Sequence, residues 1–102
     1  MSKKTYTKRD IAIEVARRMG STLDKSARYV DEIFVVMREM LCDDRPNVRI
    51  EIRNFGVFEV KPTRAKPRAR NPRTNEEIFV PAHRKSHFKP GKILKAHLSK
   101  PL

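Results

Sequence analysis

Residues 61–75 carry the side chains of this chain that are best suited to bind another molecule. The segment has six basic side chains and three prolines but no carboxylate. Its only apolar side chains are two alanines, so it cannot join a folded core. Cations without neighbouring acids are available to an anionic polymer, which points to nucleic acid. The basic residues of the segment are Lys61, Arg64, Lys66, Arg68, Arg70 and Arg73.

The charge of the chain is concentrated in its second half. Residues 1–60 have a net charge of +2, whereas residues 61–102 have a net charge of +10. This asymmetry indicates a near-neutral folded part that carries a basic appendage. Anionic lipid is a weaker candidate partner, because no amphipathic helix places large apolar side chains opposite the cations of the appendage.

Length and composition predict one small domain that is short of core residues. The chain has 102 residues, of which 38% are hydrophobic, so oligomerisation is the physical expectation. Cys42 is the only cysteine, which excludes an intrachain disulfide and fits a reducing compartment. No signal peptide is recognisable, and the longest apolar run, residues 33–37, is too short to span a bilayer. We therefore expect a cytosolic protein without a membrane partner.

Two helices are predicted before residue 42. Thr7 is a good N-cap for a first helix at residues 8–19, because its hydroxyl can accept a hydrogen bond from the backbone N–H of Asp10. Gly20 supplies the end of this helix. The second helix is placed at about residues 22–41 by the helical spacing of its apolar residues.

The second predicted helix has a wide apolar face for so small a protein. Such a face fits burial between two chains, and an ordinary core helix fits the pattern about equally well. The residues of this face that we assign to a dimer core are Tyr29, Ile33, Phe34, Met37 and Leu41.

A strand pair is predicted after the helices. Apolar and charged residues alternate over residues 48–53, the period of a half-buried strand. Residues 54–56 form a tight reversal, and residues 57–60 return as a second strand. A helix-turn-helix protein fits poorly, because neither helix has a basic recognition face.

The basic segment itself allows two interpretations. Turn-forming residues surround Pro72, Asn75 tolerates a positive φ, and residues 77–81 have strand character, so residues 61–81 are predicted to form a β-hairpin arm with Pro72 near its tip. A disordered basic tail of the Pro-Arg type fits the composition as well.

The last part of the chain predicts a short helix at about residues 91–98. Phe88 has the position of a core anchor, and Pro90 and Gly91 form a turn before the helix. Lys92 lies near the first turn, where free N–H groups and the helix dipole assist phosphate binding, although a solvated lysine face is the simpler explanation.

Three segments, in this order and near these spacings, resemble the HU/integration host factor family of bacterial DNA-bending proteins. They are Phe-Gly-Val-Phe at residues 55–58, Arg-Asn-Pro-Arg-Thr-Asn-Glu-Glu-Ile at residues 70–78 and Phe-Lys-Pro-Gly-Lys at residues 88–92. The similarity covers about residues 5–98, and the Arg-Asn-Pro-x-Thr element is its most diagnostic part.

The resemblance implies an α+β fold and an intertwined dimer. Each chain is expected to be a single domain, residues 1–102, with two N-terminal helices, a three-stranded antiparallel sheet, a protruding β-hairpin arm and a short C-terminal helix. The helical dimerisation part is expected at about residues 5–42 and the sheet with its arm at about residues 48–87. The dimer core then includes Phe55, Phe58 and Phe88.

The resemblance also implies a mechanism. Two arms enter the minor groove of DNA, and Pro72 at each tip wedges between base pairs, with readout of flexible or A·T-rich steps rather than an exact sequence. The residues implied to contact DNA are Lys61, Arg64, Lys66, Arg68, Arg70, Asn71, Arg73, Arg84, Lys85, Lys89 and Lys92.

The chain departs from the family pattern at three places. Asn75 stands where the family usually has glycine, so the tip turn is expected to be stiffer. Asn54 stands where glycine or serine is common. Residues 83–87 are unusually basic, and they either extend the DNA path along the body or only solvate that face.

No enzyme is predicted. The chain has only three glycines and lacks a phosphate-cradling loop and a supported nucleophile–base pair, so no cofactor or small-molecule substrate is expected. The histidines and the cysteine lack metal-ligand spacing, so no metal is expected.

The predicted function is a nucleoid-associated protein of the bacterial cytoplasm that binds and bends or compacts double-stranded DNA. The partner chain is expected to be an identical copy, or else a paralogue. The competing function is RNA binding or association with the ribosome, against which the pattern shows no stacking aromatics exposed in a sheet. A dimer without nucleic acid leaves the charge of +10 unexplained.

Overall fold

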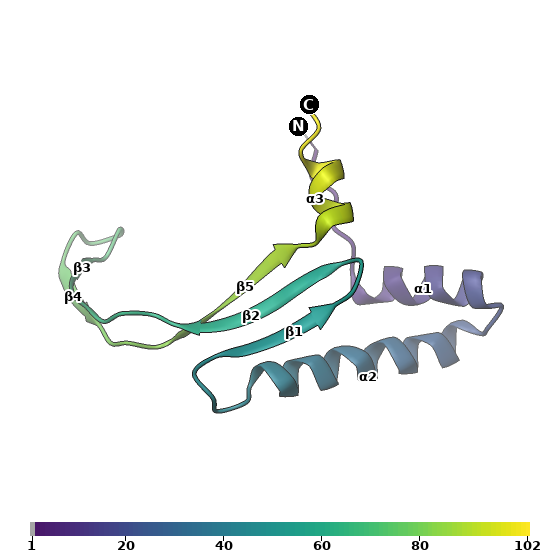
Figure 1. Cartoon of the computed structure of the whole chain (residues 1–102), viewed down its shortest axis with the longest axis horizontal. Helices are drawn as coiled ribbons and strands as arrows, with labels where there is room; N and C mark the ends of the chain where they lie inside the picture. Colours follow the sequence, from purple (N-terminus) through teal and green to yellow (C-terminus); the bar gives the residue numbers. More distant parts are fainter. Residues whose placement is uncertain (1) are drawn as a thin grey trace. The chain divides into compact units, whose positions relative to one another are not determined.

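The computed structural model describes residues 2–102, which fold as two compact units divided after Glu39. The first unit holds most of the two long helices, and the second holds both sheets and the short last helix (Figure 1). The elements in chain order are α1 (Lys8–Met19), α2 (Leu23–Leu41), β1 (Val48–Ile52), β2 (Gly56–Pro62), β3 (Lys66–Arg70), β4 (Glu77–Val80), β5 (Arg84–Pro90) and α3 (Lys92–Leu98).

Helix α1 begins and ends where the sequence predicts. The Asp10 backbone N–H donates to Thr7 Oγ1 at 3.4 Å, and the Thr7 backbone N–H donates to Asp10 Oδ2 at 2.7 Å, which completes a capping box. These bonds, with Lys4 and Arg9 nearby, hold the pKa of Asp10 below its usual value. Gly20 ends the helix with a φ of 64°, a left-handed conformation that favours glycine.

Helix α2 leaves most of its wide apolar face uncovered. The helix is capped by Thr22, whose Oγ1 accepts the N–H of Lys25 at 3.2 Å. Only Ser26 and Val30 of this helix are buried. The predicted dimer-core residues on the helix are less covered: Tyr29 is 64%, Ile33 56% and Phe34 40% exposed, and Met37 and Leu41 are half-buried.

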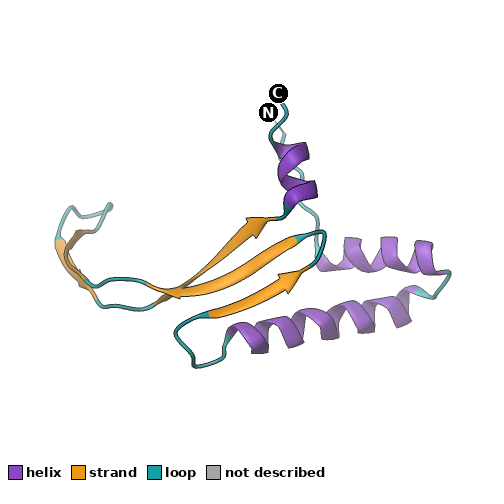
Figure 2. Cartoon of the chain, viewed as in Figure 1, coloured by secondary structure: helices purple, strands orange, loops and turns teal. Residues whose placement is uncertain are grey.

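Three strands form an antiparallel sheet in the order β1-β2-β5, as predicted for the second unit (Figure 2). Strands β1 and β2 are joined at Ile52 and Gly56 by a tight reversal in which Asn54 has a φ of 64°. Both β2 and β5 are longer than the sequence indicates: β2 extends to Pro62, and β5 continues through Pro90. An edge strand such as β5 tolerates proline because its outer side needs no hydrogen bond.

Three phenylalanines cluster on one side of this sheet. Phe58 of β2 pairs with Phe88 of β5 in the strand register, and their ring centroids are 4.7 Å apart. Phe55 in the preceding turn lies 5.3 Å from Phe88 and 6.3 Å from Phe58. Phe55 and Phe88 remain 45% and 39% exposed, so the cluster is an apolar surface rather than a closed core.

Strands β3 and β4 form a separate two-stranded ribbon. The chain enters this ribbon after β2 and leaves it before β5. The register pairs Lys66 with Val80, Ala69 with Ile78 and Arg70 with Glu77, with an irregularity between the first two pairs. The basic segment is therefore a hairpin, and the disordered-tail interpretation is not what the structure shows.

Within residues 2–102, no helix is long and apolar enough to cross a membrane.

Candidate nucleic-acid interface

The tip of the arm is a turn that presents Pro72 to solvent. The Asn71 backbone N–H donates to the Glu76 carbonyl at 2.9 Å, and the Asn75 backbone N–H donates to the Asn71 carbonyl at 2.7 Å. Asn75 adopts a φ of 59°, as its turn-forming character predicts. The Asn71 Oδ1 accepts the Arg73 N–H at 2.9 Å, so this side chain braces the tip. Pro72 is exposed within the braced turn.

The cations of the arm fall into two groups. Lys61 lies 2.9 Å from Glu59 Oε2, and Arg70 lies 3.7 Å from Glu77 Oε1 and donates to the Asn75 carbonyl at 3.0 Å. The expectation that the arm cations have no neighbouring acids is wrong for these two residues. Glu59 lies two positions before Lys61 on β2, and the antiparallel pairing of β3 with β4 places Glu77 opposite Arg70. Four others are exposed and form no ion pair within the described residues: Arg64, Lys66, Arg68 and Arg73.

Glu59 is the centre of an ion cluster on the polar face of the three-stranded sheet. Its side chain is only 6% exposed, and Lys61, Lys89 and Arg49 lie 2.9, 3.4 and 3.8 Å from its oxygens. The hydrogen bond from Lys61 is the main cause that lowers the pKa of Glu59, with a further contribution from Lys89. The same bond raises the pKa of Lys61. Sequence analysis missed this cluster, although Glu59 and Lys61 are two residues apart on one strand and so must share a face.

The two basic residues at the start of β5 have different surroundings. Arg84 Nη1 donates to the Asp43 carbonyl at 2.6 Å and to the Arg45 carbonyl at 3.3 Å, so its guanidinium fixes the loop before β1. Lys85 is exposed and forms no ion pair within residues 2–102. The basic run at residues 83–87 thus combines a structural arginine with a free lysine.

The root of the arm is held by Thr63 and His83. The Thr63 N–H donates to the His83 carbonyl at 2.7 Å, and the His83 N–H donates to Thr63 Oγ1 at 3.3 Å. The His83 Nδ1 lies 2.9 Å from the Pro81 carbonyl oxygen and 3.2 Å from Thr63 Oγ1. These bonds join the two segments of this chain that lead into and out of the arm, at the point where the three-stranded sheet ends.

Lys92 is exposed at the start of α3, as predicted. Gly91 is the N-cap, and its N–H donates to the Phe55 carbonyl at 2.8 Å, which ties the start of the helix to the β1–β2 turn. Of the two predicted body contacts, Lys92 is therefore free, whereas Lys89 is shared with Glu59.

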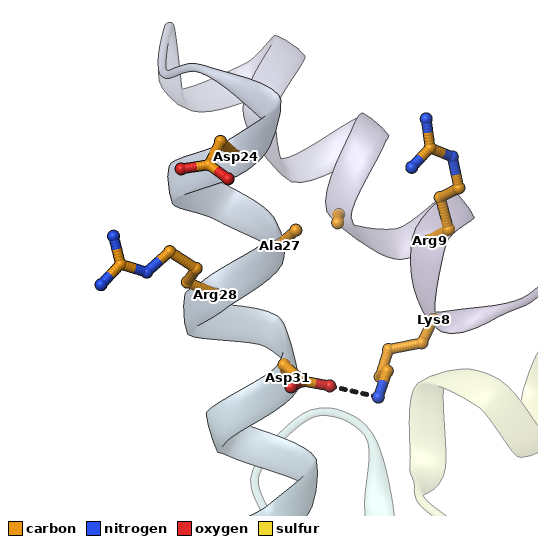
Figure 3. A pocket seen from close by; sticks show the side chains of 7 residues that line it. Lys8, Arg9, Asp24, Ala27, Arg28 and Asp31 are labelled. Atoms are coloured by element: carbon orange, nitrogen blue, oxygen red, sulfur yellow. Dashed lines mark hydrogen bonds and ion pairs between the residues drawn. The ribbon is translucent and has the colours of Figure 1, made fainter.

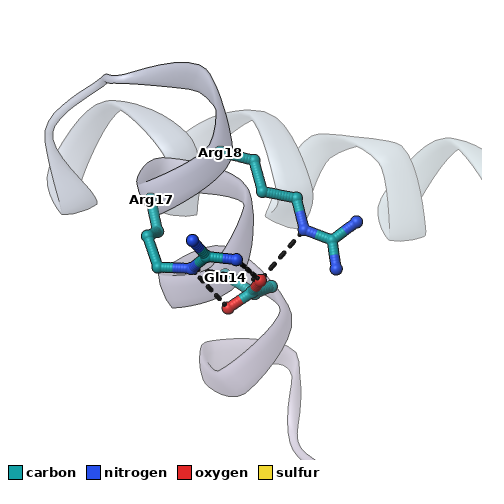
Figure 4. Close-up of polar contacts among 3 residues, drawn as sticks. All are labelled: Glu14, Arg17 and Arg18. Atoms are coloured by element: carbon teal, nitrogen blue, oxygen red, sulfur yellow. Dashed lines mark hydrogen bonds and ion pairs between the residues drawn. The ribbon is translucent and has the colours of Figure 1, made fainter.

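Several cations of the helical unit are neutralised locally. Lys8 of α1 pairs with Asp31 of α2 beside a cleft of about 300 Å³ (Figure 3). On α1, Glu14 binds Arg17 at 2.5 Å and Arg18 at 2.9 Å, and these hydrogen bonds lower the pKa of Glu14 to about 2 (Figure 4). Residues 61–102, with a net charge of +10 against +2 for residues 1–60, carry most of the excess positive charge.

The fold and the basic hairpin together define a small α+β protein with a cationic arm. The sequence pattern of the family described as "Bacterial DNA-binding protein" matches residues 6–99. The chain therefore belongs to the HU/integration host factor family of bacterial DNA-binding proteins.

Individual relatives agree with this assignment. The chain is 36% identical to the SPbeta prophage-derived DNA-binding protein HU 2 of Bacillus subtilis, over 86% of this chain and 91% of that protein. It is 36% identical to the integration host factor subunit alpha of Hydrogenovibrio crunogenus, over 90% of this chain and 91% of the relative. It is also 33% identical to the DNA-binding protein HU of Thermus thermophilus, over 97% of this chain and 98% of that protein.

A solved structure has the same fold. The HU protein of an Anabaena HU–DNA cocrystal structure superposes with a TM-score of 0.79, covering 94% of this chain and 100% of that one at 24% identity. This likeness confirms the predicted α+β architecture.

Proposed function

We propose that this protein is a non-enzymatic, nucleoid-associated protein that binds the minor groove of double-stranded DNA with two basic arms and bends the duplex. The observation that carries the proposal is the exposed Pro72 in a braced turn, at the end of a ribbon with free cations. The relatives are DNA-binding proteins by name, which supports DNA as the polymer. Sequence specificity is low, because the minor groove has a degenerate pattern of donors and acceptors.

Pro72 suits the role of a wedge. It is rigid and apolar, and it has no N–H to leave unsatisfied when it displaces a stacking contact. The bonds from Asn71 and Asn75 hold the turn, so little conformational entropy is lost on insertion. Unstacking a base step costs a few kcal/mol, and the bent duplex offsets this cost by reaching more of the basic surface.

A second chain is part of the proposal. The described residues bury only four apolar side chains, namely Ala12, Ala16, Val30 and Val60, and none of them is large. The wide face of α2 and the phenylalanine cluster are each left partly exposed. An identical copy supplies complementary apolar surface for both, and a paralogue of the same fold does so equally.

The affinity of the complex comes mainly from phosphate contacts. Within the described residues, four exposed cations of the arm and two of the body form no ion pair, namely Arg64, Lys66, Arg68 and Arg73 and then Lys85 and Lys92. Each phosphate neutralised adds about 0.9 to the salt slope, which is the magnitude of the slope of log affinity against log salt. We expect Lys61, Arg70 and Lys89 to contribute less than these, because their charges are shared with carboxylates.

The test compares Pro72→Ala with Arg73→Ala in the adjacent position. Pro72→Ala removes the wedge but no charge, so duplex binding should largely remain while the bend shrinks, as measured by energy transfer between fluorophores at the ends of a duplex of about 30 base pairs. Arg73→Ala should weaken binding and lower the salt slope by about 0.9. If Pro72→Ala bends DNA as strongly as the parent protein, the wedge is excluded.

The choice between DNA and RNA is tested at the same time. Binding of the parent protein to duplex DNA, duplex RNA and single-stranded RNA is compared at matched salt. Tighter binding to either RNA than to duplex DNA would favour the ribosome-associated or RNA-binding alternative.

A further inference from the structure

Phe79 is an exposed aromatic residue on an otherwise cationic arm. It lies in β4 and is 65% exposed, although a phenylalanine side chain is usually buried. It is not part of the phenylalanine cluster, and within the described residues no cation lies over its ring. The expectation that no aromatic is exposed in a sheet is therefore wrong for this residue, and the proposed bending of duplex DNA does not use it.

The arm changes its register opposite Phe79. Because Lys66 pairs with Val80 and Ala69 pairs with Ile78, two residues of β3, Pro67 and Arg68, face the single Phe79 of β4. An extra residue of this kind re-aims the side chains around it and is common beside functional sites. Pro67 has no N–H to donate, so its nitrogen makes no hydrogen bond to β4 at this position.

The two faces of the ribbon differ in character. Side chains alternate along a strand, so Ile78 and Val80 share one face, and Phe79 shares the other with Glu77 and its partner Arg70. Ala69 and Val80 on the first face are half-buried, whereas Arg68, Arg70 and Phe79 are all exposed. The ring is therefore exposed on the face of the ribbon that also carries the exposed Arg68 and the Arg70–Glu77 pair.

The positive charge of the arm indicates which kind of molecule binds this face. A second copy of the arm would bring like charges together, which is unfavourable. A positively charged groove combined with an exposed aromatic ring is the arrangement that binds single-stranded nucleic acid, in which bases stack on the ring and phosphates contact the cations. Intact duplex DNA does not offer a free base face to such a ring.

We propose that Phe79 is a stacking site for an unpaired base of a DNA strand, flanked by a phosphate contact from the unpaired Arg68. The inference rests on the proposed binding of DNA by the arm. It adds a base contact on β4 to the wedge and the phosphate contacts of the arm. Pro72 acts on stacked base pairs, whereas Phe79 accepts a base that is already free.

The experiment measures how strongly binding depends on the base itself. The probe is a duplex of about 30 base pairs with a gap of two nucleotides, in which the bases opposite the gap are either thymines or abasic sites. The two probes have the same phosphates, so the ratio of their dissociation constants isolates the base. We expect the full-length protein to bind the thymine probe about 5- to 150-fold more tightly, the range given by stacking one base on an aromatic ring.

Three variants locate the effect. Phe79→Ala should bring the ratio close to one and leave the affinity for intact duplex unchanged. Ile78→Ala, on the opposite face and 41% exposed, is the matched control and should keep the ratio of the parent protein. The chain contains two tyrosines but no tryptophan, so Phe79→Trp gives one selectively excitable tryptophan per chain, whose emission should be quenched by the thymine probe and not by the abasic probe.

Several results would overturn the site. The first is a ratio of the two dissociation constants near one for the parent protein. The second is a ratio in Ile78→Ala that falls as far as in Phe79→Ala. The third is a loss of affinity for intact duplex in Phe79→Ala that is as large as its loss of affinity for the gapped probe. An equally large ratio for a single-stranded RNA would overturn the assignment to DNA. Failure of the parent protein to bind intact duplex contradicts the proposed function instead, and the base ratio on the gapped probe still decides the role of Phe79.

Discussion

Replacement of Arg84 by glutamine separates the two roles that a cation can have in this protein. The sequence predicts Arg84 and Lys85 as neighbouring DNA contacts. In the structure, the Arg84 guanidinium donates to the carbonyls of Asp43 and Arg45, whereas Lys85 is exposed and has no ion-pair partner among residues 2–102. Arg84→Gln should therefore reduce stability, and Lys85→Gln should reduce DNA affinity.

The magnitude follows from the two hydrogen bonds of Arg84. A hydrogen bond from a charged group contributes about 1.5–3 kcal/mol when it is well formed and shielded. The bond to Asp43 is short at 2.6 Å, the bond to Arg45 is long at 3.3 Å, and both carbonyls belong to exposed residues that water can satisfy. We expect the lower end of the range for the pair together, about 1–2 kcal/mol of unfolding free energy.

Two assays measure the two roles on the same variants. Urea unfolding at a fixed protein concentration reports stability, and the concentration is held constant because a dimer gains stability by mass action. Arg84→Gln should lower the unfolding midpoint, whereas Lys85→Gln should stay within about 0.5 kcal/mol of the parent protein. In a salt titration of duplex binding, Lys85→Gln should lower the slope by about 0.9, and Arg84→Gln should change it by clearly less.

The refuting result is specific. If Arg84→Gln leaves unfolding unchanged and lowers the salt slope as much as Lys85→Gln, then Arg84 is a phosphate contact and its bonds to the loop contribute nothing to stability.

Two further predictions concern the sheet. Gly56→Ala should cost about 1–3 kcal/mol in urea unfolding, because the added Cβ would lie 2.5 Å from the Lys89 carbonyl oxygen and 2.7 Å from the Phe88 ring. Gly56→Asn should destabilise the protein more than Gly56→Ala. Gly20→Asn should destabilise it only mildly, because no atom lies near the added side chain and asparagine tolerates the φ of 64°. Equal losses of stability for Gly56→Asn and Gly20→Asn would contradict the steric explanation. The lowered pKa of Glu59 means that its contribution to stability is present above its ordinary pKa of 4.5 and is lost as pH falls through the lower folded value. The stability difference between the parent protein and Glu59→Gln should therefore shrink below pH 4.5, and a difference that is constant down to pH 3 would exclude this role.

Local elements were largely predictable because local chemistry determines them. Thr7 and Gly20 mark the two ends of α1 through a hydrogen-bonding hydroxyl and a permissive φ, and neither effect needs a distant partner. Alternation of apolar and charged residues indicated β1, and turn formers on both sides of Pro72 indicated the tip of the arm. The choice between a hairpin and a disordered tail required the family resemblance, because proline-rich basic segments are compatible with both.

The surroundings of charges that meet through strand pairing were not predictable. The pair of Glu59 and Lys61 could have been read from their spacing on one strand, whereas the sequence could not show that Glu77 lies beside Arg70 across the hairpin. The role of Arg84 depends on a loop about forty positions earlier in the chain.

The sequence by itself determined the family, the order of the elements, the excess of positive charge and the place of Pro72. These follow from composition, short-range spacing and motifs, which a linear chain displays directly. Only the tertiary structure decided which cations are free, that Phe79 is exposed opposite an irregular register, and that Thr63 and His83 join the root of the arm. These features depend on antiparallel register, which brings together residues that are distant in the sequence and assigns each side chain to one face.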